Sequence, residues 1–240
     1  MNPALKRIHQ AALSLFSERG ASQVNVSDLA ESAGVARGTI YNNLASPEAL
    51  FEQVASQLAS EMLERTAISF EAIDDPAHRL ALGIRLFIRR AHDEPDWGRF
   101  LICFSLTNDT LQNIWNGPPV QDLLHGLDQK RYKFREDQIP SLAGLIGGSV
   151  LASMAMVIEG HKTWREAGSD TAEFVLRSIG VSSDDAIMIS KTELPILPEL
   201  DVLKKGNKSK GSKSTVKSAA KTVVKGKVPE KSKVSRSKKA

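Results

Sequence analysis

The sequence has a single cysteine, and this shortage already excludes some classes of protein. With only Cys103 among 240 residues, the chain cannot build an intramolecular disulfide framework, which fits a reducing compartment. The first residues lead directly into a predicted amphipathic helix without the apolar core of a signal peptide. We therefore expect a cytoplasmic protein. Cys103 lies between Ile102 and Phe104 and is expected to be a thiol of the core.

Motifs typical of enzymes are also missing. The five histidines form no His-Glu-x-x-His pair and no short ligand spacing with Cys103. The segment 144–149 lacks the Gly-Lys ending of a phosphate-binding loop, and no Gly-x-Ser-x-Gly elbow is present. We expect no catalytic residue, no metal ion, no cofactor and no enzyme activity.

Residues 139–158 carry no charge, which by length alone would suit a transmembrane helix. Gly144 and Gly148 even have the small-xxx-small spacing of membrane helix pairs. However, the many Gly, Ser and Ala residues leave only modest hydrophobicity, and no second apolar span or aromatic belt accompanies them. We expect a helix buried at the centre of a helical domain or in a dimer interface, and no membrane partner.

Charge is distributed very unevenly. Residues 204–240 contain 13 Lys, one Arg and one Glu, a net charge of +13, so residues 1–203 carry −9 of the total of +4. The basic segment has no aromatic residue and is too polar to bury a core. We expect three parts: residues 1–46, a helical domain over 47–200, and a disordered lysine-rich tail over 201–240.

Apolar residues recur with the helical period and nowhere with sustained period-two alternation, so the sequence predicts an all-α fold. A loop is expected at 116–119, where Asn-Gly-Pro-Pro interrupts the periodicity. Between residues 4 and 179, we expect helices over 4–19, 26–33, 37–44, 47–70, 75–93, 139–160 and 169–179.

Two of these helices are short and are joined by a tight turn. Asn25 is a suitable N-cap for the first of them, and Gly34 is suited to end it with a positive φ. This pattern is typical of a helix-turn-helix. On the second helix, Arg37 could donate to guanine edges and Asn42 could pair with adenine. The alternative is a helical hairpin that serves packing alone.

The pattern of residues around this turn resembles the DNA-binding domain of the TetR family of bacterial repressors over roughly residues 5–58. A generic helix-turn-helix would not predict the Thr-Ile-Tyr core or the start of the following helix. The residues that carry the resemblance are Leu29, Ala30, Ala33, Gly34, Val35, Gly38, Thr39, Ile40, Tyr41, Leu44, Ser46, Glu48, Ala49 and Leu50.

The resemblance implies a role for several residues. Arg37, Gly38 and Tyr41 match positions that meet bases in the family, and Thr39 and Asn43 match phosphate contacts. Together with Ser27 and Asn42, these are the DNA-contacting residues that we expect.

For the second domain, the resemblance implies an apolar cavity for a small-molecule effector and a homodimer. The dimer would form through a four-helix interface of residues 139–160 and 169–179. The sequence does not show which apolar residues line the cavity, and large apolar side chains belong to the core more often than to a pocket. The candidates are Phe87, Trp97, Phe100, Phe104, Trp115, Met154 and Trp164.

The sequence therefore predicts a dimeric transcriptional repressor that binds an inverted-repeat operator and is released by a small apolar ligand. The alternative is a nucleoid-associated architectural protein that binds double-stranded DNA mainly through its basic tail. The tail itself is either a nonspecific DNA-binding arm or a solubilising extension.

Deleting residues 204–240 distinguishes these two roles of the tail. An arm that contacts phosphates contributes ~0.9 to the slope of log K against log salt for each charge engaged. If half of its charges engage, deletion flattens the slope by roughly 5 per subunit while the preferred operator stays the same. DNA binding titrated over a series of salt concentrations checks this, and an unchanged slope would leave only the solubilising role.

Overall fold

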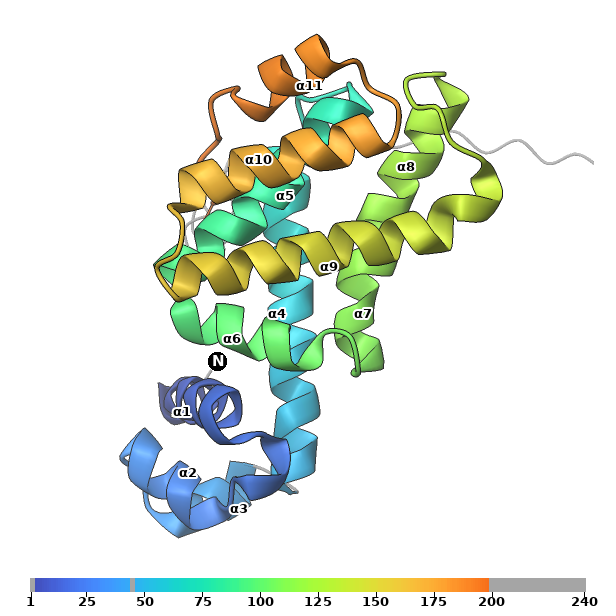
Figure 1. The fold of residues 1–240 in the computed structure, drawn as a ribbon. Coiled ribbons are helices and arrows are strands. Elements are labelled where there is room, and N and C mark those ends of the chain that lie inside the picture. Colours follow the sequence, from blue (N-terminus) through green and yellow to red (C-terminus); the bar gives the residue numbers. More distant parts are fainter. Residues whose placement is uncertain (1–2, 44–45, 199–240) are drawn as a thin grey trace, which may run out of the picture. The chain divides into compact units, whose positions relative to one another are not determined.

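The computed structural model describes residues 3–43 and 46–198, and within these ranges it contains helices and no strand (Figure 1). The expected all-α fold is confirmed. The lysine-rich tail and Leu44 lie outside the described residues. The N-terminal elements are α1 (Pro3–Arg19), the 3₁₀ helix η1 (Ala21–Gln23), α2 (Val26–Ala33), α3 (Arg37–Asn43) and α4 (Pro47–Ser69). The later elements are α5 (Pro76–Asp93), α6 (Pro95–Phe104), α7 (Asp109–Asn116), α8 (Pro118–Asp128), η2 (Glu136–Gln138), α9 (Ile139–Ile158), α10 (Trp164–Ser178) and α11 (Ser183–Ser190).

The first three α-helices pack against one another as a small bundle, and their buried residues are part of one core that continues into the later helices. The inward face of α1 is buried, with Ile8 and Phe16 almost inaccessible, and α1 ends at Arg19, before Gly20, whose φ is 80°. Leu29 of α2 and Ile40 of α3 complete this core at 0% and 1% exposure. Ile40 therefore fixes which face of α3 is left free.

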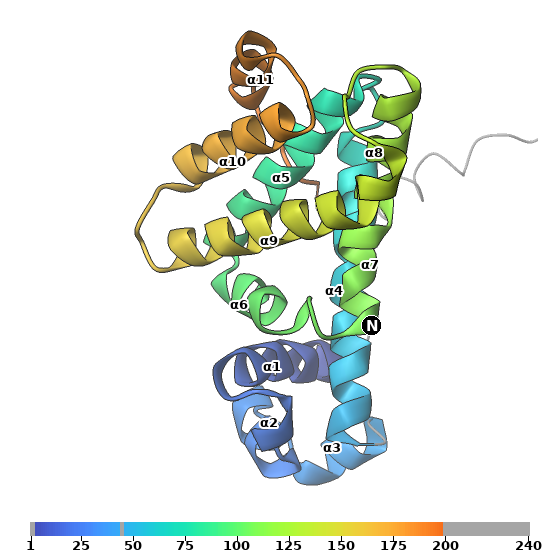
Figure 2. The ribbon, with the colours of Figure 1, turned by 45° about the vertical axis from the view of Figure 1, so that its right-hand side comes forward.

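Helix α4 connects this bundle to the rest of the described chain (Figures 1 and 2). It begins as predicted, with the Ser46 side chain accepting a hydrogen bond from the Ala49 N–H at 3.1 Å and a proline in the first turn. It then runs without interruption to Ser69 and packs against both α1 and α7. Its continuity makes it a rigid link between the two parts.

Aromatic rings join α1, α4 and α6 at one point. The ring centroid of Phe51 on α4 lies 5.4 Å from that of Phe16 on α1. On the other side, it lies 5.4 Å from Phe100 and 5.0 Å from Phe104, both of α6. Edge-to-face and offset aromatic pairs of this kind each stabilise by about 0.5–1.5 kcal/mol beyond their buried area. We refer to these four rings as the aromatic junction.

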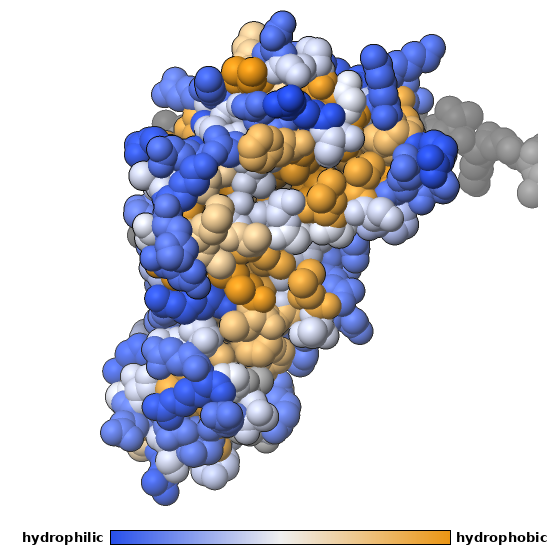
Figure 3. Space-filling model, viewed as in Figure 1, coloured by the Kyte–Doolittle hydropathy of each residue, from blue (hydrophilic) through white to orange (hydrophobic). Residues whose placement is uncertain are grey.

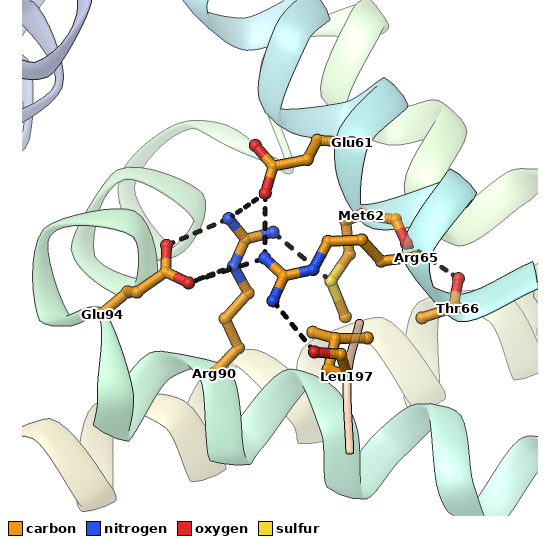
Figure 4. Close-up of polar contacts among 7 residues, drawn as sticks. All are labelled: Glu61, Met62, Arg65, Thr66, Arg90, Glu94 and Leu197. Carbon is orange, nitrogen blue, oxygen red and sulfur yellow. Dashed lines mark hydrogen bonds and ion pairs between the residues drawn. The ribbon is translucent and has the colours of Figure 1, made fainter. Parts of the chain in front are cut away.

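A group of charged side chains fixes α4 against the connection between α5 and α6 (Figure 4). Arg90 is 4% exposed and donates to Glu61 of α4 at 2.8 Å and to Glu94 at 3.0 Å. Arg65 donates to the same Glu61 at 2.9 Å, and the Arg90 guanidinium lies 4.4 Å from the ring centroid of Trp97. Because Arg90 is buried and fully paired, losing one carboxylate would leave an uncompensated charge in the interior.

Helices α5, α9 and α10 pack against one another and form the centre of the second domain. Among the described helices, α9 together with η2 is the only one long and apolar enough to span a membrane, and 44% of its most apolar window is buried in the fold. Ala143, Ile146, Val150, Met154 and Val157 form its inward face. The buried face agrees with the expected core helix.

Three sequence-based expectations need correction. Residues 118 and 119 are not a loop, because Pro118 starts α8, where its missing N–H costs nothing. The helix expected from 169 begins at Trp164, where Thr163 and Glu166 form a capping box. Cys103 is exposed, so it is not a core thiol.

Candidate nucleic-acid interface and ligand cavity

Helix α2 is capped at both ends, and the cap at its C-terminal end sets the turn into α3. The Asn25 side chain accepts hydrogen bonds from the N–H groups of Ser27 and Asp28 at 2.8 and 3.0 Å, and Asp28 bonds back to the Asn25 N–H. At the other end, Gly34 has φ 61° and donates to carbonyls of α2, including that of Glu31. The left-handed conformation favours glycine, so this residue sets the angle at which α3 leaves α2.

Helix α3 presents an exposed surface opposite Ile40. Arg37, Gly38 and Asn42 are exposed, and Tyr41 is 68% exposed, which is unusual for an aromatic ring. Within the described residues, the side chains of Arg37, Tyr41 and Asn42 have no hydrogen-bond or ion-pair partner. This helix therefore offers one cation, one amide and one phenol to an external partner.

Three further residues were expected at this surface. A Cβ at Gly38 would meet nothing within 4 Å, so packing within the protein does not require glycine there. Thr39 is half-buried, as is Ser27 near the start of α2. Asn43 is the last residue of α3, but its side chain lies outside the described residues.

A small cavity of about 50 Å³ lies in the second domain among α4, α5, α7, α8 and α9. Its wall is almost entirely apolar. It is smaller than the ~300–1,000 Å³ of typical ligand pockets, so a ligand must expand it. The lining residues are Leu63, Thr66, Phe70, Arg79, Leu80, Gly83, Ile84, Phe87, Ile114, Trp115, Pro118, Pro119, Asp122, Ile146 and Val150.

Two charged residues and one indole give this apolar wall its polar groups. Arg79 Nε donates to Asp122 Oδ1 at 2.7 Å, and its guanidinium lies over the ring of Phe70. Burial raises the pKa of Asp122, and the neighbouring Arg79 opposes that rise. The indole N–H of Trp115 is buried and has no acceptor in the described part of the chain. Such an orphaned N–H could donate a hydrogen bond to an acceptor atom of a ligand without losing an existing partner.

The structure brings only two of the seven expected pocket residues to this cavity, namely Phe87 and Trp115. Trp97, Phe100 and Met154 are fully buried in the core, and Phe104 belongs to the aromatic junction. Trp164 lines a separate surface cleft. Ring contacts nevertheless connect the two groups, since Phe87 lies 5.2 Å from Trp115 and 5.7 Å from Trp97.

Arg79 and Asp122 were not expected from the sequence. Large apolar side chains dominate both cores and cavities, so they are the residues that a sequence indicates for a pocket. The sequence does contain one signal for them. Arg79 and Asp122 carry opposite charges, and each lies in a segment whose other residues are mainly apolar. Sequence alone could not show that these residues pair, since they are 43 positions apart.

A second apolar surface lies outside, along α9 and α10 (Figure 3). Leu145 and Met156 of α9 are 46% and 39% exposed, and Phe174 of α10 is 62% exposed. Gly144 and Gly148 lie on the same helix, with open space where a Cβ would be. Gly147, in contrast, is buried, and a Cβ there would lie 3.2 Å from the ring of Trp115. Gly147 therefore belongs to the interior and not to this surface.

Comparison with protein families identifies both halves of the chain. Residues 8–54 match the family described as bacterial regulatory proteins, tetR family. Residues 75–192 match the tetracyclin repressor-like C-terminal domain.

Individual relatives match over shorter stretches. The chain is 28% identical over 92 residues to an uncharacterized HTH-type transcriptional regulator of Mycobacterium tuberculosis, Rv1255c, which covers 38% of this chain and 46% of the relative. It is 35% identical over 60 residues to YvdT of Bacillus subtilis, also an uncharacterized HTH-type regulator, covering 25% of this chain and 31% of the relative. The chain thus matches less than half the length of these curated relatives.

Solved structures match over most of the described chain. The structure of RolR in complex with resorcinol is 26% identical, covers 81% of this chain and 96% of that one, and gives a TM-score of 0.62. FadR from Bacillus subtilis, solved with stearoyl-CoA, is 21% identical, covers 75% of this chain and 98% of that one, and gives a TM-score of 0.61. At 21% identity, the match to FadR shows only that the two chains share a fold.

Gly34 and Gly38 provide a matched pair of substitutions. Gly34→Ala forces a side chain into the left-handed region and is expected to lower the free energy of unfolding by about 1–2 kcal/mol. Gly38→Ala replaces glycine inside a helix with open space around it, so it should raise this energy by roughly 0.5–1 kcal/mol. Urea unfolding followed by circular dichroism measures both. A destabilised Gly38→Ala protein would mean that α3 is packed more tightly at this point than the structure shows.

Proposed function

This chain belongs to the TetR family of bacterial transcriptional regulators, and we propose that it is a repressor whose α3 reads an operator and whose cavity binds the releasing ligand. The observation that carries the proposal is the exposed face of α3, where Arg37, Tyr41 and Asn42 are free of partners within the described residues. A DNA-binding regulator of this family acts in the cytoplasm.

The chemistry of α3 suits the major groove. An arginine pairs with two acceptors of guanine, and an asparagine pairs with adenine. Open space at Gly38 allows the helix backbone to approach the duplex closely. Tyr41, Thr39, Asn43 and Ser27 would add contacts to bases and phosphates, which set the position of the helix on the duplex.

The cavity suggests the kind of ligand. Its wall is apolar, but it includes the Arg79–Asp122 pair and the unpaired indole N–H of Trp115. A small apolar or aromatic molecule with one or two oxygen atoms would fill the space and satisfy that N–H. RolR, at 26% identity, was solved with resorcinol, a molecule of this type. We infer a ligand of the same general character for this chain.

The exposed face of α9 and α10 suggests a two-fold homodimer. Association of two subunits would bury Leu145, Met156 and Phe174. Two helices could approach closely at Gly144 and Gly148. Two reading helices would then contact the two halves of an inverted repeat. A ligand that prefers one dimer geometry changes the separation of these helices and releases the DNA.

The architectural alternative draws no support from the described residues or from the comparisons. It would rest on the lysine-rich tail, which lies outside the described range. A specificity ratio tests it directly: a repressor should prefer its operator over random duplex by ~10³ or more.

Replacing Arg37 by Ala tests the reading role of α3. We expect affinity for an operator selected from a random pool to fall by about 1–3 kcal/mol, with little loss for random duplex. Arg135→Ala is the control, because Arg135 is 72% exposed and lies just before α9. Equal weakening of operator and random DNA would make Arg37 a phosphate contact and remove it from the reading residues.

Replacing Gly148 by Glu tests the dimer. The site has open space, so the substitution should leave the subunit folded but place two charges at the two-fold axis. We expect monomers in sedimentation at micromolar concentration, with weakened operator binding and unchanged helical content. Leu106→Glu adds the same charge at a 60% exposed apolar position outside α9 and α10 and should stay dimeric. A wild-type protein that sediments as a monomer would rule out this interface.

A further inference from the structure

A basic cleft on the surface of the second domain has no role in the functions described above. It lies between α5 and α10 and is closed on a third side by the residues that follow α11. Its volume is about 440 Å³. Four cations line it, namely Arg85, Arg89, Arg165 and Lys191, against the single carboxylate of Glu193. This excess stands out because residues 1–203 as a whole carry −9, once the +13 of the tail is taken from the total of +4.

Arg85 is the cation of the cleft that a bound anion would stabilise most. It is only 9% exposed, and its one hydrogen bond runs from Nη1 to the Thr192 carbonyl at 2.7 Å. No carboxylate within the described chain pairs with it, and burial lowers its pKa. A guanidinium nevertheless stays charged in a protein. A buried, unpaired cation is costly, and an anion in the cleft would remove that cost.

Two of the other three cations, Arg89 and Arg165, contact the ring of Trp164 at the same cleft. The guanidinium carbons of Arg165 and Arg89 lie 4.3 and 5.1 Å from the centroid of its indole ring. Arg89 also has Asp93 at 3.5 Å, while Arg165 has no carboxylate partner in the described range. Cation–π contacts fix the direction of a guanidinium and leave its N–H donors free. The site is therefore organised before any ligand arrives.

The proposed dimer surface does not cover this cleft. Arg165 and Phe174 are both on α10, nine residues apart, which is two and a half helical turns. The two side chains therefore leave α10 in opposite directions. Gly168 brings α10 close to α5, since a Cβ there would touch Arg85 Cγ at 3.4 Å.

We propose that this cleft binds a small dianionic group, a phosphate or a dicarboxylate, through Arg85, Arg165 and Lys191. Guanidinium groups match both oxyanions with paired hydrogen bonds, and the cluster of cations favours two negative charges over one. The site is separate from the apolar cavity, so it gives the regulator a second input of different chemistry.

Thermal unfolding of the full-length protein tests the proposal with inorganic phosphate and malonate as probes, each compared with chloride at equal ionic strength. A probe at about ten times its Kd should raise the wild-type melting temperature by about 3 °C. Arg165→Gln should abolish most of that rise. Arg85→Met should abolish it too, with no loss of stability in chloride because a buried charge is gone. Arg135→Gln should behave as wild type.

The two probes distinguish the sources of the anion. A rise with phosphate alone indicates a phosphorylated molecule, and one with malonate alone indicates a dicarboxylate. No rise over chloride with either probe, or an equal rise in Arg165→Gln, would overturn the proposal. So would a loss of DNA affinity in Arg165→Gln in chloride buffer, because the cleft would then be a contact for DNA phosphates. If Arg85→Met does not fold, Arg165→Gln decides alone.

Discussion

The packing of Phe51 between α1 and α6 is the contact on which the rest of the arrangement depends. Helix α4 passes from the N-terminal bundle into the second domain, and at Phe51 it touches one ring of the bundle and two rings of α6. Helix α1 also packs directly against α6, and the rings at Phe51 fill the point where the three helices meet, which limits pivoting of the bundle about α4. The Arg90 pairs with Glu61 and Glu94 secure the same helix further along. Two kinds of interaction, one apolar and one ionic, therefore hold α4 in a single orientation (Figures 2 and 4).

This arrangement gives the cavity a physical connection to the N-terminal bundle. Trp115 of the cavity wall contacts Phe87, Phe87 contacts Trp97 of α6, and α6 carries the rings that meet Phe51. A cavity of about 50 Å³ cannot take a ligand without displacing part of its wall. A ligand shifts the equilibrium between two arrangements only by its difference in affinity for them. The ligand fits only the expanded arrangement of the wall, so its affinity for that arrangement is higher than for the empty one. This difference in affinity is what shifts the equilibrium.

The local features of the fold were predictable, and the long-range pairings were not. Asn25 and Gly34 cap a helix that lies next to them in the chain, so their roles could be derived from the sequence, and the structure confirms both. The burial of Trp97 and the cavity contact of Trp115 could not, since both are large apolar residues and only the packing of distant helices separates core from cavity. The prediction that Cys103 is a core thiol was wrong for the same reason. Its apolar neighbours gave no indication of whether its side chain faces the core or the solvent. The outward face of α3, where the expected DNA contacts Arg37, Tyr41 and Asn42 lie, was accessible to prediction because a short helix with one buried anchor, Ile40, leaves little choice of exposed face.

The exposed position of Cys103 makes this regulator a natural single-probe protein. It is the only thiol in the sequence, it is accessible, and it lies on α6, next to the helix turn that holds Phe104. A maleimide dye or spin label would therefore attach at one defined position without any engineered cysteine. That position is on α6, which packs against α1 of the bundle and carries Trp97, the ring next to Phe87 of the cavity wall. The signal of the label would therefore follow changes of α6 that binding at the bundle or in the cavity causes.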